Sequence, residues 1–172
     1  MPATVEIDES NGATETLTHA ITQSNYGAVD AANLNATTNP LIPGDNAFEK
    51  WQRLHITAMG GSAVVRNLRY FGTAPAANTT HNFNGHTVQA TYDGANHKQT
   101  VYAQAAVTAT RTPETVPVVA PATANIGFAG SLLGEISAAP AFSDYIVSQV
   151  RTTASATAGT TLTITFRYDE VA

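Results

Sequence analysis

Several short stretches of this chain alternate hydrophobic and polar residues with a period of two, which is typical of a β-strand with one face toward a core and the other toward water. The clearest run lies near the C-terminus. Its apolar positions are Leu162, Ile164, Phe166 and Tyr168. Its polar positions are Thr161, Thr163, Thr165 and Arg167. The run therefore predicts a strand with one wet face.

The same alternation predicts further strands along the chain. They cover residues 4–8, 64–71, 86–93 and 142–153, with a weaker candidate at 99–112. Between 48 and 59, Leu54 and Ile56 fall on one face, and Gly60 and Gly61 then permit a tight turn. We therefore expect residues 48–59 and 64–71 to pair as a β-hairpin. We also expect the last two strands to pair antiparallel through the short loop 154–159.

Three segments lack the strand pattern. Residues 30–45 contain prolines and a glycine that interrupt a ladder, and residues 72–84 are mostly Ala, Asn and Thr. Residues 112–126 carry Pro113, Pro117 and Pro121, so we expect an extended arm or a sheet edge there. Some seven to nine strands without a clear helix indicate an all-β fold: a single-domain antiparallel β-sandwich or jelly-roll-like barrel with long loops, spanning 1–172.

The period of two also predicts which side chains form the core of this domain. Each predicted strand contributes its apolar face. The predicted core residues are Val5, Ile7, Leu54, Ile56, Leu68, Val88, Ile146, Val150, Leu162, Ile164 and Phe166.

Composition narrows the class of function. Charged residues make up only 12% of the chain, and their place is taken by Ala and Thr, which suits a sheet surface with few charges. The formal net charge of -5 leaves no basic stripe, so we expect no nucleic-acid partner. No apolar run is long enough for a membrane span and no secretory leader is visible, so we expect no membrane association and synthesis in the cytoplasm of the producing cell.

The sequence contains few candidates for catalytic or metal-binding residues. There is no Cys, and the five histidines lack a recognised metal-binding spacing. A metal site built from His81, His86 and His97 is one interpretation, but we favour histidines that decorate polar loops. Asp45 and Glu49 are a similar candidate for Ca²⁺, without the pattern of a calcium-binding loop. No nucleophile elbow or nucleotide-binding loop is present. We therefore expect no enzymatic activity, no catalytic residue, no cofactor and no metal.

Aromatic residues offer one alternative of another kind. Trp51, Tyr70 and Phe71 lie on the predicted hairpin and could form a platform on which sugars stack. An aromatic side chain on a strand more often belongs to the core, and this is the interpretation we favour.

Five stretches together carry a resemblance to a known group. They read "NYGAVDAANL", "NPLIPGDNAFEKWQRLHI", "VRNLRYF", "SDYIVSQVRTT" and "ITFRYDE". In this order they resemble structural proteins encoded in the head and tail modules of tailed bacteriophages. The resemblance covers the first half and the last thirty or so residues, whereas residues 73–125 do not match.

The resemblance implies a virion component, and in the first place a capsid decoration (cement) protein on the outer surface of the phage head. The implied partners are the major capsid protein and copies of the chain itself, with a trimer as the first expectation. A tail or head-to-tail joining protein is the alternative. A carbohydrate-binding or receptor-binding β-sandwich module is a further one.

Overall fold

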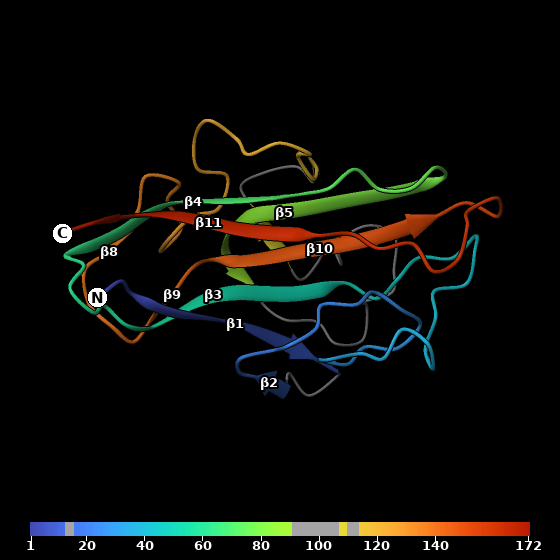
Figure 1. The fold of residues 1–172 in the computed structure, drawn as a ribbon, viewed down its shortest axis with the longest axis horizontal. Coiled ribbons are helices and arrows are strands. Elements are labelled where there is room, and N and C mark those ends of the chain that lie inside the picture. The colour runs from blue at the N-terminus through green and yellow to red at the C-terminus, as the bar shows by residue number, and fades with distance from the viewer. Residues whose placement is uncertain (13–15, 91–106, 110–113) are drawn as a thin grey trace.

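A computed structural model describes residues 1–12, 16–90, 107–109 and 114–172 of the chain, and the side chains of these residues apart from 84–90 and 107–109. In this part of the chain all regular structure is β (Figure 1). The strands are β1 (Thr4–Asn11), β2 (Thr16–Thr18), β3 (Lys50–Ala58), β4 (Val64–Gly72), β5 (Thr79–Ala90), β6 (Val107–Ala109), β7 (Glu114–Thr115), β8 (Glu135–Ile136), β9 (Ala141–Phe142), β10 (Tyr145–Thr152) and β11 (Ile164–Val171).

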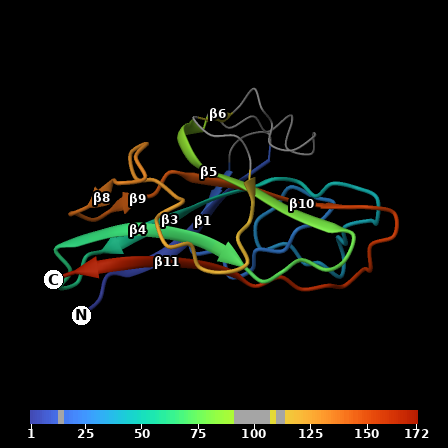
Figure 2. The same cartoon turned by 90° about the horizontal axis from the view of Figure 1, so that it is seen from above.

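The strands form two antiparallel sheets. Within the described ranges the larger sheet has eight strands in the order β2-β1-β3-β10-β5-β6, with β7 paired to β5 and β9 to β3. The smaller sheet has three, in the order β11-β4-β8. The layers are separated in Figure 2, where β4 and β11 lie side by side and β5 and β10 belong to the other layer. The fold is therefore an all-β, sandwich-like arrangement, as the alternation predicts, and not a closed barrel.

The predicted hairpin between β3 and β4 is wrong. Both strands exist, but β3 pairs with β1 on one edge and with β10 and β9 on the other, so neither edge is left for β4. The turn at Gly60 carries the chain across to the smaller sheet instead. Gly60 has φ +60°, and a Cβ there would lie 2.3 Å from the carbonyl oxygen of Pro2, so this crossing requires glycine.

The predicted pairing of the last two strands is wrong for the same reason. β10 is central in the larger sheet, between β3 and β5, whereas β11 pairs with β4 in the smaller one. The loop 154–159 thus connects two layers and does not close a hairpin. The predicted loop 72–84 is also too long, because β5 already begins at Thr79.

The core lies between the two sheets. Leu54, Ile56, Leu68, Ile146 and Val150 are buried, as predicted. Four other predicted core residues are partly buried and pack against the same cluster: Val5, Ile7, Ile164 and Phe166. Leu162 is half-buried. The side chain of Val88 lies outside the described residues.

The alternation on β4 changes phase in the middle of the strand. Strict alternation places Val65 on the face of the strand opposite to that of Leu68 and Tyr70, yet all three side chains are buried. Asn67 lies between them with φ 54°, and the register against β11 shifts at the same point. The extra residue of this β-bulge turns the first part of the strand over, which places Val65 in the core.

The Pro-rich segment is joined to both sheets. β7 pairs with β5, the amide of Gly72 on β4 donates to the carbonyl of Pro117, and the amide of Ile126 donates to the carbonyl of Leu68. Val116 and Ile126 are buried in the core, whereas Val118 and Val119 are 54% and 74% exposed. The expected extended arm is therefore a bridge across one side of the sandwich, with an exposed apolar middle.

Candidate functional site

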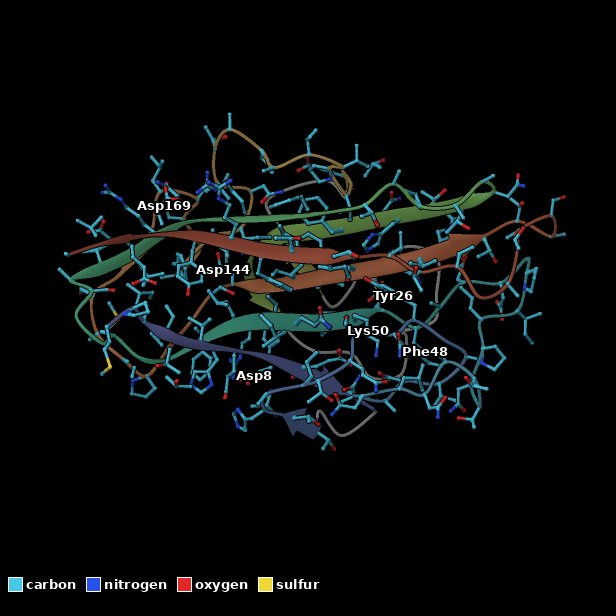
Figure 3. All side chains as sticks on the ribbon, viewed as in Figure 1. Asp8, Tyr26, Phe48, Lys50, Asp144 and Asp169 are labelled. Atoms are coloured by element: carbon cyan, nitrogen blue, oxygen red, sulfur yellow. The ribbon has the colours of Figure 1, made fainter. Side chains whose placement is uncertain are left out.

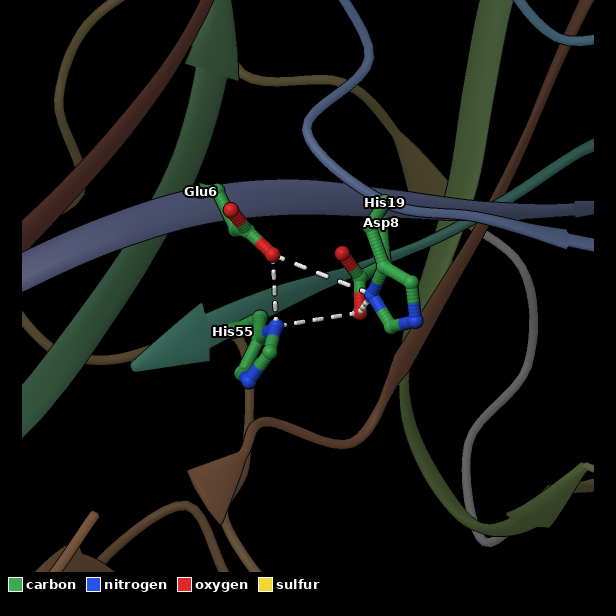
Figure 4. A group of neighbouring side chains, drawn as sticks. All are labelled: Glu6, Asp8, His19 and His55. Atoms are coloured by element: carbon green, nitrogen blue, oxygen red, sulfur yellow. Dashed lines mark hydrogen bonds and ion pairs between the residues drawn. The ribbon is translucent and has the colours of Figure 1, made fainter. Parts of the chain in front are cut away.

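Four side chains of the kind that bind metals converge on the larger sheet. Glu6 and Asp8 are two residues apart on β1, so both project from the same face of the sheet. His55 on β3 stands directly across from Glu6 in the register of the two strands. His19 follows directly after β2, which pairs with the far edge of β1. Figure 4 shows the four side chains turned toward one another.

The ligand atoms of this group are close together. His55 Nδ1 lies 2.8 Å from Glu6 Oε1 and 3.3 Å from Asp8 Oδ2. His19 Nδ1 lies 3.7 Å from Glu6 Oε1 and 3.0 Å from Asp8 Oδ2. In the described part of the chain, no other group of at least three histidines and carboxylates converges in this way.

Aromatic and cationic neighbours hold this group in place. The ring of His55 packs on Phe142 with centroids 4.4 Å apart, and the guanidinium of Arg53 lies 3.7 Å above the same Phe142 ring. Arg53 Nε is 3.9 Å from Asp8 Oδ2. Exposure rises from Asp8, which is fully buried, through His55 and Glu6 to His19, whose side chain is 55% exposed.

The histidines singled out from the sequence do not form a site among the described residues. His81 is buried between the sheets, where its Nε2 lies 2.9 Å from the Tyr26 hydroxyl. Burial lowers the pKa of His81 to about 4, so the ring is neutral at pH 7. The expectation of a loop histidine is therefore wrong for His81. The side chain of His86 and the whole of His97 lie outside the described residues.

The other candidate residues from the sequence are the Asp45 and Glu49 pair and the three aromatic residues. Glu49 is buried and accepts a hydrogen bond from Trp51 Nε1 at 3.1 Å, and Asp45 accepts one from the amide of Asn46. Trp51 on β3 and Tyr70 on β4 are fully buried, as favoured above, so these two side chains do not form an exposed platform. Phe71 is half-buried.

A second polar group lies inside the molecule, where the loop between β2 and β3 covers the larger sheet. Lys50 Nζ lies 2.7 Å from Glu9 Oε1 and also donates to the carbonyl of Ala31 at 2.8 Å. Gln52 Nε2 donates to Glu9 Oε2 at 2.7 Å. Figure 3 shows Lys50 on β3 beside the loop that carries Tyr26. These contacts tie the loop to the sheet, although Gln52 Oε1 has no hydrogen-bond partner among the described residues.

A cleft of about 280 Å³ opens between the loop 24–41 and the loop 157–162. Its walls include Leu41, Val150, Leu162 and Ile164, and the remainder is mostly Thr and Ala. Among the described residues that line it, Tyr26 is the only one with a titratable side chain. The described lining of the cleft therefore offers no pair of carboxylates of the kind that glycoside hydrolysis uses.

Sequence reasoning missed the group on β1 and β3. Its signal is weak, because Glu6 and Asp8 are two alternate residues of one strand and the histidines are 11 and 47 residues beyond Asp8. Only the pairing of β1 with both β2 and β3 brings the four together, and alternation does not reveal which strands are neighbours.

Comparison with known proteins returns no relative. No protein-family model, no curated protein and no solved structure matches this chain. Within the described ranges the chain forms no helix with the length and apolarity needed to cross a membrane.

Proposed function

We propose that this chain is a non-enzymatic virion structural protein that decorates and cements the head of a tailed bacteriophage. The observation that carries the proposal is the Pro-rich bridge, whose ends are fixed in the sandwich while Val118 and Val119 face solvent. An apolar segment that is already ordered binds a neighbouring subunit with little further loss of entropy.

Two other features support a structural role. The chain has few charges, which suits broad and mostly neutral contacts repeated over a symmetric shell. The described residues that line the cleft include no catalytic pair, and the aromatic candidates Trp51 and Tyr70 are buried. These features favour an assembly protein over an enzyme or a sugar-binding module.

The proposal is tested by mixing the purified protein with undecorated capsids assembled from the major capsid protein of the same genome. A decoration protein binds in a saturable way, with many copies over the shell, and raises the temperature at which the capsid breaks, because it binds the assembled state alone. A few copies at one vertex or on the tail would support the joining role instead. Binding to a glycan array without capsid binding would support the carbohydrate-binding module.

Point substitutions in the bridge make this test sharper than its removal. Deleting 112–125 would also remove Val116 and Asn125 from the core, so loss of binding could reflect unfolding. The double substitution Val118→Ser and Val119→Ser leaves the core intact and should weaken capsid binding. Ile42→Ser, at a residue that is 62% exposed on another loop, is the matched control and should bind as the parent does.

A further inference from the structure

We propose that Glu6, Asp8, His19 and His55 bind one divalent transition-metal ion, and that Zn²⁺ is the ion they suit. Two imidazole nitrogens and two carboxylate oxygens are a ligand set that zinc accepts, usually in tetrahedral geometry. The proposal stands apart from the phage role and departs from the absence of metal expected from the sequence.

Four of the six distances between the ligand atoms are close to the edge length of a zinc tetrahedron. With zinc-to-ligand distances of about 2.0–2.1 Å, neighbouring ligand atoms are about 3.3 Å apart. The four nitrogen-to-oxygen distances in the group run from 2.8 to 3.7 Å, on both sides of that value. All four ligand atoms lie within 4.8 Å of one another. An ion at their centre is thus within reach of all four after small adjustments.

The environment of Asp8 is an independent observation that points to a cation at this position. Its side chain is fully buried, and among the described residues neither of its carboxylate oxygens has a hydrogen-bond partner. Two ring nitrogens approach Oδ2 to 3.0 and 3.3 Å without the alignment that a hydrogen bond needs. A buried carboxylate without hydrogen bonds is costly, and a cation between the carboxylate and the rings removes that cost.

The surroundings supply the orientation and the access that a metal site needs. Phe142 packs on the His55 ring and so fixes the plane of that ring, and Arg53 Nε lies 3.9 Å from Asp8 Oδ2. With neutral histidines the two carboxylates and Arg53 sum to a charge of -1, so a divalent cation is electrostatically favoured. His19 is 55% exposed, which leaves a path for the ion from solvent.

The site has a structural role in this proposal. Four protein ligands complete the coordination of zinc and leave no position for substrate. The ion would join β1, β3 and the residue that follows β2, so it would fasten the edge of the larger sheet.

The test uses untagged full-length protein that has been treated with a chelator and then dialysed, because a polyhistidine tag binds zinc itself. Calorimetric titration with Zn²⁺ should give one ion per chain, and the thermal midpoint should rise with Zn²⁺. Ca²⁺ and Mg²⁺, which prefer oxygen ligands, should leave the midpoint unchanged. Co²⁺ in place of Zn²⁺ should give the visible absorption of a tetrahedral complex.

Variants connect the binding to the four residues. His19→Ala changes an exposed side chain, so the fold should survive, and Zn²⁺ affinity should fall by at least about tenfold, as losses around metal sites commonly do. Glu6→Gln should act in the same direction. Glu135→Gln, at an exposed carboxylate on β8, is the matched control and should bind Zn²⁺ as the parent does.

Two results would overturn the proposal. One is a titration in which Zn²⁺ gives neither heat nor a rise in the thermal midpoint. The other is tight binding that persists in the folded His19→Ala, Glu6→Gln double variant, which would place the ion on other histidines.

Discussion

The side chain of Asn125 pairs with the backbone of Tyr70 as if it were a neighbouring strand. Its Oδ1 accepts from the Tyr70 amide at 2.8 Å, and its Nδ2 donates to the Tyr70 carbonyl at 2.8 Å. Both residues are buried. On this edge of β4, β8 pairs with Val65 and Arg66 and does not extend to Tyr70. The Asn125 side chain supplies both hydrogen bonds there.

The first prediction concerns this pair. Asn125→Ala leaves a buried amide and a buried carbonyl without these partners, so the free energy of unfolding should fall by about 2–4 kcal/mol. Thr123→Ala, at an exposed residue of the same segment, should change it by less than about 0.5 kcal/mol. Chemical denaturation of both variants measures the difference. Equal effects would show that the Asn125 side chain does not hold the segment to β4.

The second prediction compares two residues assigned to the core by the same alternation. Ile56 is fully buried and Ile164 only partly. Ile56→Ala should lower the free energy of unfolding by about 2–5 kcal/mol, because it leaves a cavity between the sheets. Ile164→Ala should cost clearly less, because the side chain borders the cleft. A larger loss for Ile164→Ala in denaturant titrations would contradict this ranking.

Sequence reasoning identifies elements of this fold better than their partners. The alternation predicts β1 and β11, because a strand with one solvent-exposed face repeats every two residues. It also locates β10 and its buried Ile146 and Val150, but Val147 and Gln149 on the other face are buried as well. It carries no information on which strand lies beside which. The two predicted hairpins fail for that reason, since β3 and β10 have both edges occupied within the larger sheet.

The candidate site depends on the same missing information. From the sequence, Glu6 and Asp8 belong to the polar face of the opening strand, and His55 belongs to the polar face of another strand. The register of β1 against β3 places Glu6 directly across from His55, so these two polar faces lie side by side in the sheet. The bulge at Asn67 is a different case, because its φ of 54° is an accommodation of the backbone to β11 that alternation alone does not predict.

The third prediction concerns the buried ion pair of Lys50 and Glu9. Lys50→Met removes the partner of a buried carboxylate and should lower the free energy of unfolding by about 3–5 kcal/mol. Glu9→Gln and the double variant complete a double-mutant cycle. Because the second change removes the unpaired charge, the double variant should be more stable than the sum of the single losses predicts, by about 1–3 kcal/mol. Additive losses would indicate that the two side chains act independently.

The last prediction concerns the pH dependence of stability that arises from His81. Burial lowers the pKa of His81 to about 4 in the folded chain, whereas an unfolded histidine titrates near 6.5. Between these values the unfolded chain binds a proton that the folded chain does not bind, so stability falls as the pH decreases. Above pH 6.5 the titration of His81 does not lower the free energy of unfolding. Once the pH has fallen through 4, it has lowered the free energy of unfolding by about 3 kcal/mol.

Two measurements check this. In histidine ring NMR spectra of the folded protein, one ring should stay neutral until the pH approaches 4. In denaturant titrations across this range, His81→Gln, which cannot take up the proton, should lose less stability toward acid than the parent does. A His81 ring that titrates near pH 6.5 in the folded chain would mean that water or a charged group reaches it between the sheets, and the Tyr26 contact at 2.9 Å would then not exclude solvent from that part of the core.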